Sequence, residues 1–319
     1  MRLFADANYN FIGNRRVAYV LSAVALGIAL VGALYFQFSR GSWLAYGVDF
    51  TGGTLVQVEF REETPVGEVR EAVAAVAPGT EITRFGAENE YLIRAPQFVE
   101  GGADVSDAVV RALTERFGAD GFTVSRSEAV GPKIGGELQQ RAAFAVLLSF
   151  AMMLVYLAFR FEWRFGVAAV VAILHDVAIT LGILSVFRIE VALPTVAAVL
   201  TIVGYSINDT IIVFDRAREN LKKTGRREKL ADILNRSINE TLPRTVLTGG
   251  TTLATLLSLF VLGGETIRNF AFILFLGILI GTYSSIFVAS PVLLAVTERW
   301  KPKPAGKKTA RPTRAGVAV

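Results

Sequence analysis

Six long apolar runs, separated by charged segments, dominate the chain. A helix that crosses the hydrocarbon core of a bilayer needs about 20 mostly apolar residues, and these runs come close to or exceed that length. They cover residues 17–38, 142–159, 166–187, 194–214, 246–262 and 270–296. The first run is longer than the apolar core of a signal peptide and is not followed by an A-x-A cleavage site, so we expect it to remain as a helix. The pattern predicts an α-helical polytopic membrane protein with six transmembrane helices.

The long polar segment 39–141 has the pattern of a small folded domain. Its predicted elements follow the order strand, helix, strand, strand, helix, strand, which is the ferredoxin-like split βαβ arrangement. The predicted strands are 53–61, 80–85, 91–96 and 122–130, and the predicted helices are 66–77 and 104–117. Glycine pairs at 52–53 and 135–136 flank the domain. We interpret them as hinges or tight turns, because neither is followed by the Lys-Ser/Thr pair of a nucleotide-binding loop.

Basic residues in the connections predict the orientation of the helices, because Lys and Arg favour the cytoplasmic side of short loops. Nine basic residues lie in the loop 215–245, and seven lie between Arg299 and the C-terminus. The connections after the third and fifth apolar runs hold only Arg188 and Arg268, respectively. The predicted cytoplasmic parts are therefore 1–16, 215–245 and the basic tail 297–319, and the predicted extracytoplasmic part is 39–141.

The net charge of +5 is explained by this loop asymmetry and does not indicate a nucleic-acid partner. The basic tail is most simply an anchor that follows the positive-inside rule, although it could also contact anionic lipid, nascent chain or ribosomal RNA. The chain has no cysteine, which excludes disulfides and thiol chemistry. No cofactor or metal is expected, because no ligand cluster is apparent in the sequence.

Ionisable residues inside two of the apolar runs are the strongest functional signal. Asn208 and Asp209 lie side by side in the fourth run, and His175, the only histidine, lies beside Asp176 in the third. A charged carboxylate at membrane depth costs at least about 2.5 kcal/mol on insertion scales, so such residues usually line a substrate or ion path. The two runs predict a proton or ion path through a helix bundle.

Each of these residues also has a purely structural interpretation. Asp209 could pair with a basic residue to fix helix packing, and Asn208 could make an interhelical hydrogen bond. His175 can relay protons near neutral pH, but it could equally be a hydrogen-bonded contact, with Asp176 as its neighbour in a polar interior. The small-residue pair Gly277 and Gly281 could form a seam with a partner or pack within the chain.

Five stretches carry a specific family resemblance. They are GVDFTGGTLVQVEF at 47–60, VGPKIGGELQQRA at 130–142, LHDVAITLG at 174–182, VGYSINDTIIVFDRARENL at 203–221 and NRSINETLPRTVLTGGTTL at 235–253. In this order, around six predicted helices, they resemble the SecF family of bacterial Sec protein export over nearly the whole chain.

This resemblance implies half of an RND-superfamily transporter in the bacterial cytoplasmic (inner) membrane, with a SecD subunit supplying the other six helices. It implies that the proton motive force is used to draw unfolded exported polypeptide from the SecYEG channel after the ATPase SecA has pushed it from inside. YajC or YidC are further implied partners. In this family the aspartate of the SINDT motif and the arginine of the ETLPRT motif serve the proton pathway, and they correspond to Asp209 and Arg244. Arg244 could otherwise extend to the lipid headgroups.

Three other functions compete with this interpretation. An RND-type exporter half for small molecules or lipids would share the helix pattern, although such exporters normally carry about twelve spans in one chain. An intramembrane serine protease could use Ser206 and His175 as a dyad, but Asp209 has no part in that chemistry, and we do not expect an enzyme. A third possibility is a scaffold that stabilises a channel without moving protons.

Overall fold

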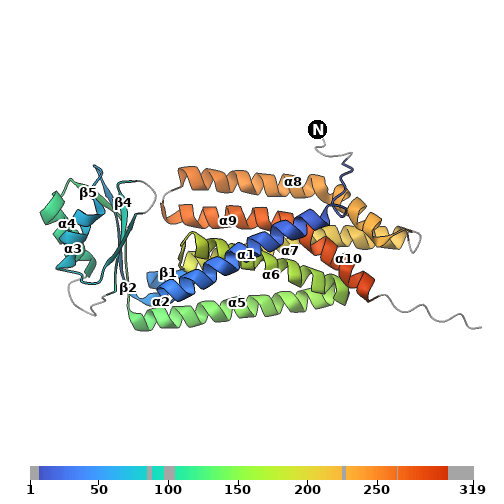
Figure 1. Cartoon of the computed structure of the whole chain (residues 1–319), viewed down its shortest axis with the longest axis horizontal. Helices are drawn as coiled ribbons and strands as arrows, with labels where there is room; N and C mark the ends of the chain where they lie inside the picture. Colours follow the sequence, from blue (N-terminus) through green and yellow to red (C-terminus); the bar gives the residue numbers. More distant parts are fainter. Residues whose placement is uncertain (1–6, 85–87, 97–104, 225–227, 264, 301–319) are drawn as a thin grey trace, which may run out of the picture.

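Six apolar helices, long enough to cross a membrane, run side by side along the molecule (Figure 1). The computed structural model describes residues 7–84, 88–96, 105–224, 228–263 and 265–300. Within these residues the spanning helices are α1 (Arg15–Arg40), α5 (Pro132–Arg160), α6 (Trp163–Val186), α7 (Leu193–Thr224), α8 (Leu230–Leu262) and the continuous run of α9 (Glu265–Ser284), the π-helical η1 (Ser285–Ala289) and α10 (Ser290–Arg299). The predicted fold class, a six-helix bundle with a small α+β domain, is confirmed.

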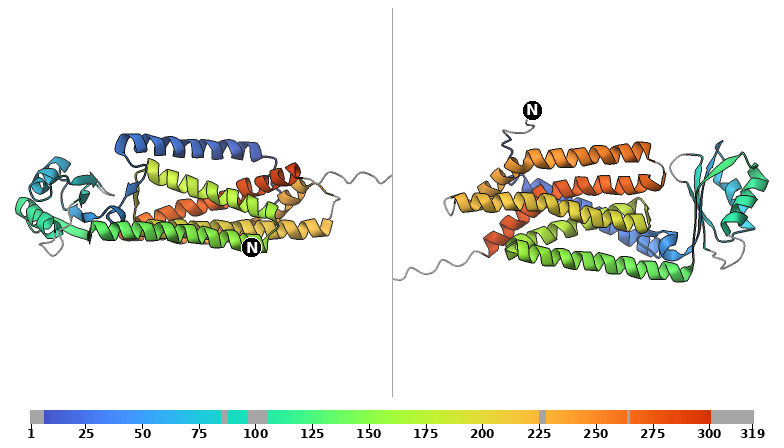
Figure 2. Two further views of the ribbon diagram at one scale, coloured as in Figure 1. Left: turned by 90° about the horizontal axis from the view of Figure 1, so that it is seen from below. Right: turned by 180° about the vertical axis from the view of Figure 1, so that it is seen from behind.

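Several helices extend well beyond the apolar runs that predicted them. α5 begins at Pro132, ten residues before its expected start, and its first turn is opened by that proline. α7 continues to Thr224 and α8 begins at Leu230, so most of the segment 215–245 is helical. The two extensions form an antiparallel hairpin that projects at the end of the bundle opposite the α+β domain (Figure 2). We call this end the distal end.

The α+β domain lies at the other end of the bundle and has the ferredoxin-like topology. Its sheet has the order β3-β4-β2-β5, and each neighbouring pair is antiparallel. The elements are β2 (Gly53–Phe60), α3 (Val66–Ala74), β3 (Glu81–Arg84), β4 (Glu90–Ala95), α4 (Val105–Phe117) and β5 (Phe122–Val130). The two helices cover one face of the sheet, where Val58, Val69, Tyr91 and Val109 are fully buried in one apolar core.

The start of the domain is packed tightly against the bundle at a glycine pair. Gly52 and Gly53 have positive φ angles of 72° and 112°, which residues with a Cβ rarely adopt. A Cβ on Gly52 would lie 2.8 Å from the Cα of Pro132, and one on Gly53 would lie 2.5 Å from the carbonyl oxygen of Ala95. Of the two interpretations from the sequence, a tight turn describes this pair.

Two further contacts join the α+β domain to the bundle. β1 (Ala45–Tyr46) pairs in parallel with β6 (Glu190–Val191), which lies between α6 and α7. Arg94, on β4, forms a salt bridge of 3.2 Å with Glu190. Burial raises the pKa of Glu190, against the opposing effect of the Arg94 and Arg126 guanidiniums. The connection is therefore partly ionic and partly made of backbone hydrogen bonds.

Small residues bring α7 and α9 together in the middle of the bundle. A Cβ on Gly277 would lie 2.1 Å from Ile202, and one on Gly281 would lie 2.9 Å from the Cβ of Ser206. The small-residue pair therefore packs within this chain, which settles the alternative left open by the sequence. α1 and α5, by contrast, bury very little of their apolar surface against the rest of the chain.

Candidate functional site

A buried hydrogen-bond network joins α6 to α7 at mid-bundle. The hydroxyl of Ser206 on α7 donates to Oδ2 of Asp176 on α6 over 2.5 Å. The other carboxylate oxygen of Asp176, Oδ1, lies 2.8 Å from Nδ1 of His175. Ser284, at the end of α9, lies beside this group and donates to the backbone carbonyl of Ala172 on α6 over 3.4 Å. All four side chains are buried, and each oxygen of the Asp176 carboxylate has a hydrogen-bond partner.

The network continues from His175 to α1 and α9. Nε2 of His175 lies 3.0 Å from the hydroxyl of Ser22 on α1, and that hydroxyl lies 3.1 Å from the hydroxyl of Tyr283 on α9. Tyr283 donates to the backbone carbonyl of Ala18 over 2.8 Å. Its ring also stacks on the imidazole, with ring centroids 6.2 Å apart. Ser22 and Tyr283 had not been identified from the sequence.

Asp209, the most prominent candidate in the sequence, differs from Asp176 because its carboxylate has no hydrogen-bond donor among the described residues. It lies three residues after Ser206 on α7, which is less than one helical turn further along. The side chain is completely buried, yet neither carboxylate oxygen has a hydrogen-bond partner among the described residues. The hydroxyl of the neighbouring Thr210 is also buried and unpaired there. A buried carboxylate without donors is strongly disfavoured when it is charged.

Arg244, on α8, is the charged group that interacts electrostatically with Asp209. α7 and α8 run antiparallel, and two contacts fix their register: Tyr205 contacts Thr252, and Arg216 contacts Glu240. Interpolation between these pairs places Asp209 at the same height in the bundle as about residue 248. Arg244 is then about 6 Å from that level along the axis, toward the distal end. Its side chain is exposed and forms no salt bridge with any other described residue. Arg244 and Asp209 therefore interact electrostatically without forming a salt bridge.

Asn208 does not join the buried network. It is exposed on α7, on the same face as Thr201 and Gly204. α8 also exposes polar side chains at apolar depth, namely Arg244, Thr251, Thr255 and Ser258. A lipid-facing surface would not be expected to carry an arginine and an asparagine, so these faces of α7 and α8 are suited to contact with another protein.

The geometry gives no support to a serine-protease dyad. Ser206 donates to Asp176, and the two ring nitrogens of His175 contact Asp176 and Ser22. Ser206 and His175 are thus not hydrogen-bonded to one another. Among the described residues, no group of three or more His, Cys, Asp or Glu side chains is placed to hold a metal ion.

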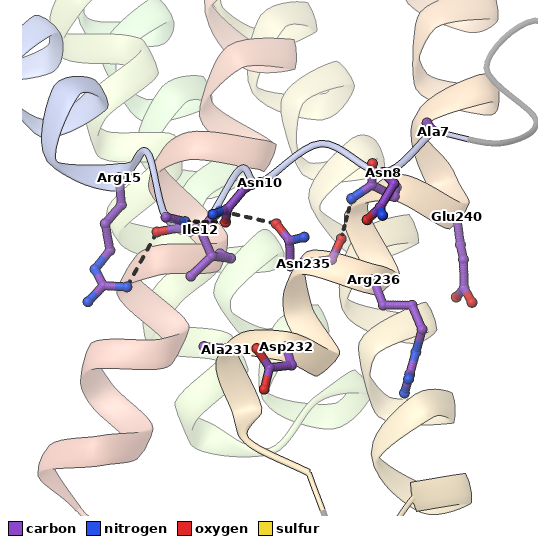
Figure 3. A pocket seen from close by; sticks show the side chains of 12 residues that line it. Ala7, Asn8, Asn10, Ile12, Arg15, Ala231, Asp232, Asn235, Arg236 and Glu240 are labelled. Carbon is purple, nitrogen blue, oxygen red and sulfur yellow. Dashed lines mark hydrogen bonds between the residues drawn. The ribbon is translucent and has the colours of Figure 1, made fainter.

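A polar cavity lies away from this network, near the distal end. It has a volume of about 500 Å³ and lies between the N-terminal segment and the start of α8 (Figure 3). Asn239 donates to the carbonyl of Tyr9 over 2.9 Å and accepts from its backbone N–H over 2.8 Å, and Asn235 accepts from the N–H of Ile12 over 3.3 Å. These contacts fasten the N-terminal segment to α8. None of the residues lining the cavity belongs to the buried network.

Fold and site together define a multi-pass membrane protein with ionisable side chains buried between its helices, as in ion-coupled transporters. Comparison with known families agrees. Residues 109–299 match the family described as "Protein export membrane protein SecD/SecF, C-terminal", and residues 42–63 match the "SecD/SecF GG Motif". The chain belongs to the SecD/SecF family.

Individual relatives extend the match over the whole chain. The chain is 46% identical to "Protein translocase subunit SecF" of Gemmatimonas aurantiaca, covering 100% of this chain and 96% of the relative. It is 43% identical to "Protein translocase subunit SecDF" of Thermus thermophilus, covering 95% of this chain but only 40% of that relative. These relatives are protein translocase subunits, which supports protein export over small-molecule export and agrees with the expectation that the protein is not an enzyme.

Solved structures show the same fold. The crystal structure of SecDF from Thermus thermophilus superposes with a TM-score of 0.80 at 41% identity, covering 94% of this chain and 40% of that one. A second structure, "SecDF in Super-membrane-facing form", superposes with a TM-score of 0.64 at 40% identity, covering 92% of this chain and 39% of that chain. In both cases this chain spans about two fifths of the solved chain.

Proposed function

We propose that this protein is a SecF-type subunit that uses the proton motive force to assist protein export through the Sec channel. The observation that carries the proposal is the state of Asp209, a fully buried carboxylate with no hydrogen-bond donor among the described residues. Such a group is stable when it is protonated, or when a cation comes close to it. It can therefore alternate between a proton and a positive charge.

Arg244 supplies that positive charge in the proposed cycle. When Arg244 approaches, the charged form of Asp209 is stabilised and the proton is released; when Arg244 withdraws, a proton must bind again. The exposed and unpaired guanidinium is consistent with such movement. In this proposal Asp176 and His175 form the polar surroundings of the path, and Asn208 lies at its edge, on the exposed face of α7.

The partner that completes the path is proposed to be SecD. The match to a single SecDF chain that is more than twice as long supports this, because that relative combines both names in one polypeptide. The exposed polar residues of α7 and α8 need a protein surface opposite them. SecD would provide that surface and would enclose Arg244 and Asn208 in a shared interior.

The remaining topology and partners follow from the same proposal. The distal end, with the basic hairpin of α7 and α8, would face the cytoplasm of a bacterial cell, and both termini would lie there. The α+β domain would lie outside, in the position to receive unfolded polypeptide emerging from SecYEG after SecA has acted. YajC or YidC would be neighbours in the same membrane. A cysteine at Glu88 and a cysteine at Lys223 should then label from opposite sides of the membrane.

Export into inverted vesicles tests the proposal. Vesicles that contain SecYEG, SecA, SecD and this chain are supplied with ATP, and export is measured with and without a proton gradient. Asp209→Asn should insert and bind SecD normally but lose the response to the gradient. Arg244→Ala should lose it as well, because the carboxylate then stays protonated.

A matched control is Asp215→Asn, two turns along α7, where the carboxylate is partly exposed and paired with Arg160. This variant should keep the full response to the gradient, and export driven by ATP alone should be unchanged in all three variants. If Asp209→Asn responds to the gradient as wild type does, Asp209 is structural and the proposed proton path is wrong.

A further inference from the structure

The hydroxyls of Tyr283 and Ser22 form a hydrogen-bonded series that ends at His175, and we call it the hydroxyl chain. Its first hydrogen bond can have only one direction, and this direction determines where each of the following hydrogens lies. Tyr283 donates to the carbonyl oxygen of Ala18, which can only accept. A phenol has one hydrogen, so the oxygen of Tyr283 must act as the acceptor in its 3.1 Å contact with Ser22. The hydroxyl hydrogen of Ser22 therefore points at Tyr283.

The same counting continues to the imidazole. Because the single hydrogen of Ser22 is used on Tyr283, the Ser22 oxygen must accept in its 3.0 Å contact with Nε2 of His175. Nε2 must then carry a hydrogen. On the other side of the ring, Nδ1 faces the carboxylate of Asp176 at 2.8 Å, and that contact also needs one hydrogen.

Two arrangements satisfy all of these contacts. In the first, His175 carries a hydrogen on both nitrogens and faces a charged Asp176. In the second, Asp176 is protonated and donates to Nδ1 of a ring that carries its hydrogen on Nε2. They differ only in the place of one proton along the 2.8 Å contact. A neutral ring beside a charged carboxylate has only one hydrogen for two contacts. If that hydrogen is on Nε2, Nδ1 and the carboxylate oxygen are both acceptors; if it is on Nδ1, Nε2 and the Ser22 oxygen are both acceptors.

We infer that His175 and Asp176 together hold one exchangeable proton, and that Ser22 and Tyr283 are positioning residues that keep it there. This inference rests on the proposed function, to which it adds a second proton-holding group. Ser206 links the pair to α7, where Asp209 lies three residues further on. Of the other titratable groups, Tyr283 on α9 stacks on the ring of His175, and Asp209 lies on α7 three residues after Ser206; from α1, the Ser22 hydroxyl contacts Nε2.

Release of this proton requires a defined rearrangement. For Nε2 to become an acceptor, the Ser22 hydroxyl must turn and donate to it. To keep its contact with Ser22, Tyr283 must then donate to the Ser22 oxygen and lose its hydrogen bond to the carbonyl of Ala18. The hydroxyl hydrogens of Ser22 and Tyr283 thus reverse together as Nε2 loses its proton, and the contact with the α1 backbone is broken. The hydroxyl chain couples the protonation of the pair to the seating of α1 against α9.

Nitrogen NMR of the histidine ring tests the inference without any transport measurement. His175 is the only histidine of this chain, so the difference between ¹⁵N-histidine spectra of the wild-type and His175→Gln complexes isolates its signal from those of a partner. At neutral pH, we expect an Nε2 that carries hydrogen. Tyr283→Phe should convert the ring to a bare Nε2, because Ser22 is then free to donate to it.

Two variants separate positioning from general damage. Tyr205→Phe removes a hydroxyl that contacts Thr252 and takes no part in the hydrogen bonds from Tyr283 through Ser22 to His175. This variant should leave the spectrum unchanged. Ser22→Thr keeps the hydroxyl and should retain the hydrogen on Nε2, whereas Ser22→Ala should lose it. A bare Nε2 in the wild-type complex, or a spectrum of Tyr283→Phe identical to that of wild type, would overturn the inference.

The NMR experiment and the export experiment can fail independently of each other. If the NMR result is as expected but Asp209→Asn still responds to the gradient, the pair holds its proton and the proposed path is wrong. If Asp209→Asn loses the response but Nε2 of wild type is bare, the path stands and the second proton-holding group does not.

Discussion

The carboxylates of Asp176 and Asp209 are both buried within the helix bundle, but their surroundings are opposite. Asp176 is approached by Ser206 and the ring of His175. Asp209 is completely buried and has no hydrogen-bond partner among the described residues. Less than one turn of α7 separates the residue that binds Asp176 from Asp209 itself.

This difference indicates two roles within one polar interior. A carboxylate whose oxygens are occupied has a defined hydrogen-bonding state, and its network specifies how the helices pack. A carboxylate with no partner contributes little to the packing but changes its protonation when a charge moves nearby. We therefore expect folding to depend mainly on Asp176 and, under the proposed function, the response to a gradient to depend mainly on Asp209.

The largest expected effect comes from exchanging the two carboxylates for amides. Asp176→Asn removes one partner from a buried charged network, a change that typically costs about 3–5 kcal/mol. Asp209→Asn breaks no hydrogen bond within the described residues and replaces a buried carboxylate that is stable when it is protonated, so its effect on stability should be under about 1 kcal/mol. Thermal unfolding of the purified complex measures both. A greater loss of stability in Asp209→Asn than in Asp176→Asn would reverse the assignment of roles.

An intermediate effect is expected from two glycine substitutions, one in the close contact at Ser206 and one at an uncrowded position of a helix. Gly281→Ala would place a Cβ 2.9 Å from the Cβ of Ser206, so α9 or Ser206 must shift, and such overpacking costs about 1–3 kcal/mol. Gly166→Ala, in the first turn of α6, meets nothing within 4 Å and should be neutral or slightly stabilising. Equal melting temperatures for the two variants would contradict the close packing at Ser206.

The smallest effect concerns a third buried carboxylate, Glu190, at the end of the bundle that carries the α+β domain. Burial raises its pKa, so the folded state binds the proton more tightly than the unfolded state does. The resulting stabilisation is present below the ordinary pKa of a glutamate and is lost as the pH rises through the raised value. Glu190→Gln should therefore flatten the decline in melting temperature between mildly acidic and neutral pH.

Glu59 provides the control for that measurement, since it is exposed on β2 of the same domain. Glu59→Gln should follow the pH profile of the wild-type protein. If Glu190→Gln also runs parallel to wild type, the salt bridge to Arg94 fully offsets the burial of Glu190, and this carboxylate does not respond to pH.

The sequence predicted those parts of the site that depend on one helix at a time. Asp209 could be identified because a charge within an apolar run is unusual by itself. Ser22 and Tyr283 could not be identified, because a single hydroxyl is common in membrane helices and the contact between them joins positions 261 residues apart. The missing hydrogen bonds of Asp209 are likewise a property of packing and have no signal in the sequence.

The fold shows the same division between local and tertiary information. The ferredoxin-like order of strands and helices follows from local patterns, and β5 matches its predicted range from Phe122 to Val130. The amphipathic pattern of 215–245 predicts a helical stretch at the membrane interface, whereas in the structure most of this segment continues α7 and α8, because a helix does not end where its hydrophobic residues end. The π-helical turn from Ser285 to Ala289 was not predicted, because the apolar run 270–296 is equally compatible with a regular α-helix.

Infrared difference spectroscopy of the complex with SecD tests most directly whether Asp209 takes up a proton. Spectra recorded on the two sides of a pH step should contain the carbonyl band of a protonated carboxylic acid in a buried setting. This band should be absent from Asp209→Asn and should persist in Asp215→Asn, whose carboxylate is partly exposed. An unchanged band in Asp209→Asn would show that another group carries the proton, and it would contradict the account given for Asp209.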